Sequence, residues 1–260
     1  MTFPAVKRVV YKKNLLDEVV CQVRFPPILK IDTETPAAFQ EMLRSAYPNL
    51  TEAYEVLFDL RAGSPQGSME ELQKVRRTRD SKNYEFVSED NKWKINLTKN
   101  FLALSTKEYV RWEDFISRFE KALLPFIDVY KPADFTRVGL RYIDVVVRSR
   151  LGLDGVDWNE LIQEYILGVL AVNNIKGKIR SYENIFQAAL EGKGVVRVST
   201  KTVQSSESGE HCYIIDSDFF ESGRIKHEAV LPILSGFHGH ALNLFRWCIK
   251  DKLHDAMKGE

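Results

Sequence analysis

The chain has 260 residues, of which 44% are hydrophobic and 11% aromatic, a composition typical of a globular protein with one large domain or two small ones. Its 37 basic and 36 acidic residues leave a net charge of +1, which excludes a whole-protein field that attracts polyanions and restricts any nucleic-acid site to a local patch. Cys21, Cys212 and Cys248 show no CxxC spacing, which favours a reducing cytoplasm. There is no signal-peptide pattern and no apolar window of about 18 residues, so we expect neither secretion nor a membrane span.

The first half of the chain predicts a strand, a helix, a three-stranded meander and a long helix. Alternating apolar residues indicate the strands, turn residues separate them, and a 3-4-7 apolar spacing indicates the long helix. These elements cover residues 16–25, 36–47, 84–87, 93–98, 101–106 and 109–130. A flexible insert at residues 63–68 precedes a basic segment, and the pattern does not decide whether residues 71–80 form a helix or a strand.

The second half repeats this order of elements. A strand from Arg137 precedes a helix at 158–172, strands at 184–190, 195–203 and 211–218, and a last helix. The apolar stripe of that helix is Leu242, Phe245, Cys248, Ile249, Leu253 and Met257. Residue identity between the halves is negligible, so only the element order matches.

Two such halves predict an α+β fold. We expect β-α-β-β-β-α units at residues 1–132 and 133–260, joined as one compact domain or an intimate pair. Their strands would form one curved antiparallel sheet with the long helices on one face, because each amphipathic helix must bury its apolar stripe. The analogy is the saddle of the TATA-binding-protein or helix-grip type.

Five segments occur in an order that resembles a sporadically distributed TIGRFAM family of bacterial proteins. The segments are residues 17–25, 84–106, 109–115, 137–144 and 215–218. The resemblance implies a bacterial cytoplasmic protein, and its patchy distribution is associated with mobile, defence or toxin-antitoxin contexts. The family carries no assigned function, so no catalytic residue is transferred. This chain has Asp144 where such proteins usually show Asn.

The strand that begins near Arg137 carries opposite chemistry on its two faces. Val138, Leu140 and Tyr142 alternate with Arg137, Gly139 and Arg141, because successive side chains of a strand point to opposite faces. Two guanidinium groups beside a glycine are suited to an anion or a flat group approaching the backbone. In the predicted fold, Gln22 and Arg24 from the equivalent strand would join this face. Alternatively, both arginines pair with acidic neighbours or pack under a helix. From Ile143 to Val147 only Asp144 interrupts the apolar residues, which indicates that both faces become covered there.

A second candidate site is the basic segment at residues 74–79. Its cations are Lys74, Arg76, Arg77 and Arg79, which would suit phosphate contacts. The aromatic residues Tyr84, Phe86 and Trp93 lie close enough in sequence to offer stacking planes. Alternatively, the segment is a solvated basic face and the aromatic residues form a buried strand face.

A third candidate site pairs Asp216 with Asp218, which a strand places on one face. Together with a histidine they could hold a divalent cation. The histidines of this half are His211, His227, His238 and His240. Their spacing forms no metal motif, and the alternative is that both carboxylates cap a strand end or bond nearby backbone amides.

No GxSxG, P-loop or GxGxxG pattern is present, and these are the usual signatures of nucleophilic or nucleotide-dependent catalysis. We therefore expect no cofactor and a non-enzymatic binding or regulatory protein. Its sheet face with Arg137 and Arg141 would bind a protein or nucleic-acid partner. The alternative function is a metal-dependent or phosphate-processing enzyme that uses Asp216, Asp218 and the arginines. A third possibility is a homodimer whose sheet edges pair.

Overall fold

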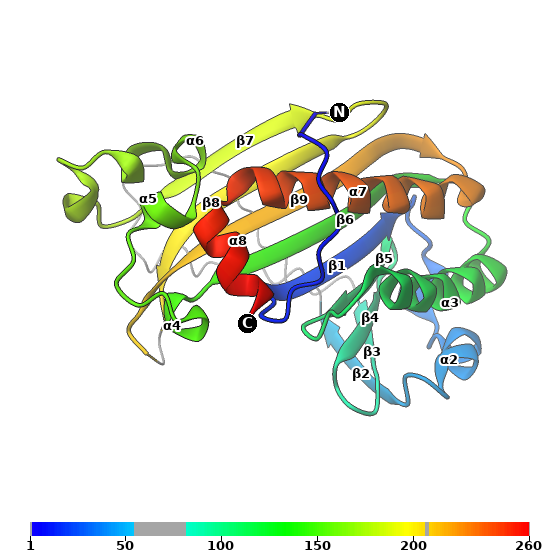
Figure 1. Ribbon diagram of the computed structural model, residues 1–260. Helices are drawn as coiled ribbons and strands as arrows, with labels where there is room; N and C mark the ends of the chain where they lie inside the picture. The colour runs from blue at the N-terminus through cyan, green and yellow to red at the C-terminus, as the bar shows by residue number, and fades with distance from the viewer. Residues whose placement is uncertain (1, 55–81, 206–207, 260) are drawn as a thin grey trace.

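The computed structural model describes residues 2–54, 82–205 and 208–259. In this part of the chain all the strands form one nine-stranded antiparallel sheet in the order β2-β3-β4-β5-β1-β6-β9-β8-β7 (Figure 1). The strands are β1 (Leu16–Arg24), β2 (Asn49–Tyr54), β3 (Lys82–Val87), β4 (Trp93–Leu97), β5 (Phe101–Thr106), β6 (Phe135–Val146), β7 (Glu183–Ala189), β8 (Val195–Gln204) and β9 (His211–Ile225). The predicted α+β class and the large antiparallel sheet are confirmed.

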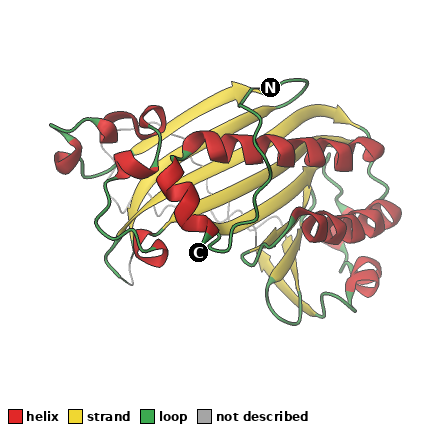
Figure 2. Ribbon diagram, in the orientation of Figure 1, coloured by secondary structure: helices red, strands yellow, loops and turns green. Residues whose placement is uncertain are grey.

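The long helices lie on one face of this sheet (Figure 2). The helices are α1 (Lys30–Thr33), α2 (Ala37–Leu43), α3 (Trp112–Tyr130), α4 (Arg148–Leu151), α5 (Trp158–Leu161), α6 (Glu164–Leu167), α7 (Val230–Cys248) and α8 (Asp251–Lys258), with 3-10 turns η2 (Gly168–Ala171), η3 (Lys176–Lys178) and η4 (His227–Ala229). Within the described ranges, none of these helices combines the length and the apolar character needed to cross a membrane.

Strands β1 and β6 pair at the centre of the sheet and join the two halves of the chain. Their antiparallel register sets Gln22 opposite Gly139 and Val20 opposite Arg141. Alternation buries the residues that face α3 and α7, because these supply the apolar surface that the helices cover. In β1 and β6 the fully buried side chains include Val19, Cys21, Val23, Val138, Leu140 and Val146.

The N-terminal segment, residues 2–15, forms a strap over the helical layer (dark blue in Figure 1). The backbone N–H of Val6 donates to Asn243 of α7, and Arg8 donates two hydrogen bonds to Glu113 of α3. The Lys13 N–H then donates to the Met257 carbonyl of α8. The strap therefore connects three helices that the chain reaches much later.

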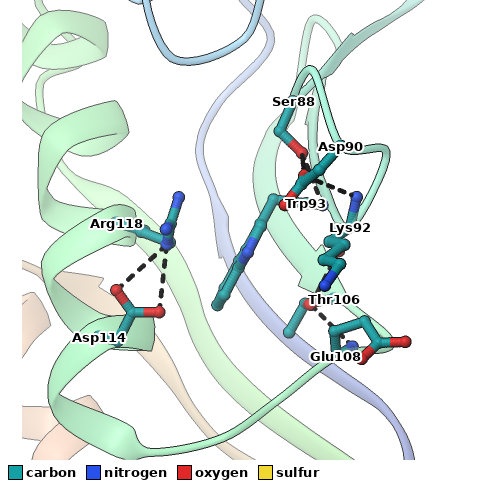
Figure 3. A network of polar contacts seen from close by, with 8 residues as sticks. All are labelled: Ser88, Asp90, Lys92, Trp93, Thr106, Glu108, Asp114 and Arg118. Carbon is teal, nitrogen blue, oxygen red and sulfur yellow. Dashed lines mark hydrogen bonds and ion pairs between the residues drawn. The ribbon is translucent and has the colours of Figure 1, made fainter.

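The turn between β3 and β4 is stabilised by its own side chains (Figure 3). The Ser88 hydroxyl donates to Asp90 at 2.6 Å, and the Trp93 N–H donates to Ser88 Oγ at 3.0 Å. The hydrogen bond from Ser88 lowers the pKa of Asp90. Asn91 has a φ of 57°, a left-handed conformation that asparagine adopts more readily than most residues.

The prediction of one helix at residues 158–172 is wrong. The structure has two short helices there, because α5 ends at Leu161 and α6 begins at Glu164. Ile162 is extended and pairs with Ile249 in an isolated antiparallel bridge. The Gln163 N–H donates to the Cys248 carbonyl, and the Lys250 N–H donates to the Leu161 carbonyl. The Ile162 N–H still donates to the Trp158 carbonyl, but the Gln163 N–H and the Leu161 carbonyl bond to the chain at residues 248 and 250 in place of helical partners.

The last helix was predicted as one continuous element, and this prediction is also wrong, because the bridge at Ile249 separates α7 from α8. Ile249 is extended, so the apolar stripe from Leu242 to Met257 is divided between α7 and α8. Strand β2 is an addition to the predicted elements, and β9 continues seven residues beyond its predicted end at Asp218, to Ile225. The predicted insert at 63–68 and the basic segment at 74–79 lie outside the described residues.

Candidate functional site

The predicted residues of the first candidate site come together on the sheet face that points away from α3 and α7. Adjacent strands bring β1 and β6 side by side, and their outward side chains line a hollow of about 300 Å³. The lining residues are Val20, Gln22, Arg24, Arg137, Gly139, Arg141 and Asp218. We name this surface the arginine hollow.

Arg137 does not project into solvent but runs along β6 over Gly139. A Cβ atom at position 139 would lie 2.3 Å from Arg137 Nη1 and 2.9 Å from its Cζ. The glycine therefore makes space for the guanidinium, which donates to both oxygens of Asp218 at 2.8 Å. The same guanidinium lies 4.8 Å from the ring centre of Phe220, within the range of a cation–π contact.

Arg141 makes a two-pronged ion pair with Asp216, whereas Arg137 uses only Nη2 on both oxygens of Asp218. Arg141 Nε donates to Oδ1 at 2.7 Å and its Nη2 donates to Oδ2 at 2.5 Å. This geometry matches the planar fork of a guanidinium to a carboxylate, and the hydrogen bond raises the pKa of Arg141. The two arginines thus pair with acidic neighbours across β6 and β9, which is one of the alternatives that the sequence left open.

Arg24 differs from the other two arginines of the hollow. Its Nε donates to the neutral Gln22 Oε1 at 2.9 Å, and among the described residues it forms no ion pair. Arg24 is exposed, so its guanidinium is available to an incoming group. The hollow therefore has three guanidinium groups and the single carboxylate of Asp218 on its walls.

Because the Arg137 guanidinium packs over Gly139, substitutions at these two positions should have coupled effects on stability. We expect Arg137→Ala to lower the free energy of unfolding by about 1 kcal/mol in the parent chain, because the lost ion pair is only partly exposed. After Gly139→Ala, which displaces the guanidinium, Arg137→Ala should change it by about 0 kcal/mol. Chemical denaturation of the four proteins measures this cycle. If Arg137→Ala lowered the free energy of unfolding equally in the parent chain and in Gly139→Ala, the packing of Arg137 over Gly139 would be contradicted.

The aromatic residues of the second candidate site are part of the core. Tyr84, Phe86 and Trp93 are buried, so they offer no free stacking plane, and the buried-face alternative holds for them. Trp93 is covered by the Arg118 guanidinium at 4.4 Å, and Arg118 in turn donates to Asp114 (Figure 3). The cations Arg76, Arg77 and Arg79 lie outside the described residues.

The third candidate site is occupied by arginines. Asp216 and Asp218 do lie on one face of β9, but each carboxylate accepts hydrogen bonds from a guanidinium. His227 Nε2 lies 2.7 Å from the Pro132 carbonyl, and His238 Nδ1 lies 2.9 Å from the Tyr142 hydroxyl. Within the described ranges, no group of three His, Cys, Asp or Glu side chains converges to hold a metal ion.

Two further features concern the edges and the opposite face of the sheet. The outer strands of the described sheet are β2 and β7. That two copies of the chain pair through these edges as a homodimer stays a prediction.

On the helix-covered face, the structure has a cavity that contains Asp144. No site was predicted from the sequence for this cavity. Its signal was nevertheless visible, because Asp144 alone interrupts an apolar run.

Comparisons of the chain with protein-family models, with curated proteins and with solved structures found no match.

Proposed function

We propose that the protein is a non-enzymatic binding or regulatory protein of the bacterial cytoplasm that meets a macromolecular partner, a protein or a nucleic acid, through the arginine hollow. The observation that carries this proposal is a hollow with three guanidinium groups and one carboxylate on its walls. Arg137 and Arg141 are fixed in place by Asp218 and Asp216. Arg24 supplies a cation without a carboxylate partner in the described part of the chain.

An acidic protein segment suits this hollow better than a nucleic-acid backbone. Nucleic-acid binding needs several cations that neutralise successive phosphates. Asp216 and Asp218 already neutralise two of the arginines, so only about one cation remains uncompensated. A carboxylate side chain that receives one guanidinium fork from Arg24 needs no more than this.

The alternative enzyme would use Asp216, Asp218 and the arginines on a metal ion or a phosphate. A divalent cation would have to displace Arg141 from Asp216, or Arg137 from Asp218, before it could bind that carboxylate. Each contact is a charge-assisted hydrogen-bond pair, so the displacement has a substantial cost. The ion pairs therefore favour the binding function over the alternative.

Charge reversal at Arg24 tests the binding function. In pull-downs from a bacterial lysate, we expect Arg24→Glu to weaken capture of the partner about tenfold or more, because it places a carboxylate where the partner's carboxylate would bind. Arg44→Glu is the matched control, since Arg44 is an exposed residue that follows α2 and pairs with Glu41 there.

Nuclease treatment of the lysate separates the two kinds of partner. Capture that survives nuclease and is lost in Arg24→Glu supports a protein partner. Capture that nuclease abolishes assigns the hollow to a nucleic acid instead. If Arg24→Glu retains everything that the parent chain and Arg44→Glu retain, the arginine hollow is not the binding surface.

We also propose that residues 1–132 and 133–260 are equivalent halves of a saddle of the TATA-binding-protein or helix-grip type. In support, β1 and β6 pair at the centre, and each has a strand of its own meander, β5 or β9, on its other side. Each meander is followed in the chain by a long helix, α3 or α7. The sporadically distributed bacterial family, with its mobile, defence or toxin-antitoxin contexts, remains the family to which we propose the chain belongs.

A further inference from the structure

A second cavity lies on the other face of the sheet, beneath the N-terminal strap. Its volume is about 110 Å³, and it is lined by the strap, the loop before α3, strands β1, β6 and β9, and helices α7 and α8. We name it the strap cavity. The residues that matter for its chemistry are Tyr11, Tyr109, Tyr142, Asp144, Ser217 and His238.

The strap cavity contains a carboxyl group without a partner. Asp144 lies on the helix-covered face of β6 and is only 6% exposed. None of the hydrogen bonds and ion pairs among the described residues involves its carboxyl. A bulge in β1 between Leu16 and Glu18 lies directly opposite Asp144, and bulges commonly redirect a side chain next to a functional site. A buried and unpaired carboxyl is costly to a fold, so it calls for an explanation.

The walls around this carboxyl are mainly aromatic and apolar. Tyr109 and Tyr142 meet edge to face at 6.1 Å, and His238 stacks on Trp112 at 4.5 Å. His238 Nε2 is buried without a hydrogen-bond partner, and burial lowers the pKa of His238 to about 4. The histidine is therefore neutral near pH 7 and does not compensate Asp144.

The chemistry of the cavity selects among ligand classes. A metal ion would need more than one ligating carboxylate, and the described residues offer no such cluster. An anion would be repelled by Asp144. Of the two cations that line the cavity, Arg8 is already paired with Glu113, and Arg111 is exposed to solvent. A neutral apolar ligand would leave the carboxyl desolvated. An organic cation satisfies the carboxylate and gains from the aromatic faces.

We propose that the strap cavity binds a primary ammonium group on a short aliphatic chain, with the ammonium paired to Asp144. The size sets the length of the chain. A cavity of about 150 Å³ holds benzene, so this smaller one takes about five non-hydrogen atoms. The ammonium replaces the water that Asp144 loses on folding. This proposal is independent of the arginine hollow, which lies on the opposite face of the sheet.

The groups that face Asp144 define how binding responds to pH. They are Arg8 and Tyr11 of the strap, Tyr109 and Arg111 of the next loop, Tyr142 of β6, and His238 and Cys248 of α7. Burial raises the pKa of Asp144 to about 8. Burial also raises the pKa of Tyr109 to about 12 and that of the Cys248 thiol further above its ordinary value. Between pH 6 and 8, Asp144 is thus the group here that changes charge.

A titration with n-butylamine tests the proposal. We expect ligand-observed NMR at pH 8 to show binding of n-butylammonium that is at least about tenfold tighter than binding of 1-butanol or butyrate, which share its size but lack the positive charge. Affinity should fall at least about tenfold between pH 8 and pH 6, because a protonated Asp144 must release its proton to pair with the ammonium.

Two variants locate the binding. Asp144→Asn keeps the shape of the side chain but removes its charge, and it should weaken n-butylammonium at least about tenfold. Ala241→Leu fills the cavity from α7 with the carboxyl intact, and it should weaken binding to a similar extent. Asp128→Asn, on the exposed side of α3, is the matched control and should bind like the parent chain.

The outcomes decide the proposal in either direction. Absence of butylammonium binding, equal binding of 1-butanol, or unchanged binding by Asp144→Asn or Ala241→Leu would each overturn it. If the amine binds, Nα-acetyl-lysine N-methylamide identifies the source of the ammonium. Tighter binding of this probe than of n-butylamine indicates a lysine side chain of a protein, and weaker binding indicates a free small amine.

Discussion

Phe126→Ala is expected to lower the free energy of unfolding by about 3–5 kcal/mol, the largest loss that we expect from a single substitution. Phe126 of α3 is fully buried, and its ring packs against rings from several elements. Phe25 lies 4.7 Å from it, Phe39 and Phe135 each lie 6.4 Å from it, and Tyr130 lies 5.4 Å from it. Truncation therefore opens a cavity between both halves of the chain. Urea denaturation followed by far-UV circular dichroism measures the change.

Two controls on the same helix separate cavity formation from helix propensity. Phe126→Leu preserves most of the volume and should cost about 1.5 kcal/mol or less. Leu124 is 57% exposed, so Leu124→Ala should change the free energy of unfolding by about 0.5 kcal/mol or less. If Phe126→Ala cost no more than Leu124→Ala, the ring cluster would not be a cooperative part of the core.

Local sequence patterns predicted the strands and helices that bury one face along their whole length. The alternation of Val19, Cys21 and Val23 predicted β1, and the 3-4-7 stripe of Phe115, Phe119 and Phe126 predicted α3. Both patterns arise because one face of the element is buried along its whole length. β2 lacks this signal, since it is an outer strand of the described sheet and its Leu50 is 38% exposed.

Long-range pairing explains what local patterns could not predict. Ile162 and Ile249 are both apolar and sit in helix-like patterns, but they pair with each other as extended residues. Their separation in sequence hides this bridge from any local window. The same limit applies to the arginine hollow. The RxGxR spacing located its floor, whereas the pairing of Arg137 with Asp218 depends on the register between β6 and β9.

Asp144 shows how an exception to a pattern carries information. A charged residue in an apolar run either interrupts the strand or remains buried at a cost, and local sequence does not decide between these outcomes. The structure places it in the buried set of β6, beside Tyr142. The cost of this burial should be visible in the stability of the protein.

Asp144→Asn is expected to raise the free energy of unfolding at pH 7 by about 2–4 kcal/mol. Burial raises the pKa of Asp144 to about 8, whereas an unfolded aspartate has a pKa of about 3.9. Between these values the folded chain retains a proton that the unfolded chain has released. Unfolding therefore releases a proton, and the free energy of unfolding falls as the pH rises through this window. An asparagine does not titrate and removes this loss.

The pH dependence distinguishes this cause from a change in packing. The stabilisation by Asp144→Asn should grow from about 0 kcal/mol or slightly below at pH 4 to its full value near pH 8, because the carboxyl is protonated in both states at the low end. Urea denaturation of both proteins at several pH values measures the difference, and Asp128→Asn should show no such growth. A difference that is constant with pH would contradict a raised pKa.

Binding of an amine should oppose this difference. If n-butylammonium pairs with the ionised Asp144, it stabilises the folded parent chain by about 2.7 kcal/mol at 100 times its dissociation constant. The variant lacks the carboxylate and should gain little at the same concentration. At pH 8 the parent chain with amine should therefore approach the stability of Asp144→Asn. Both measurements would then report on the same group: Asp144→Asn measures the cost of burying its carboxyl, and the amine measures how far a bound cation offsets that cost.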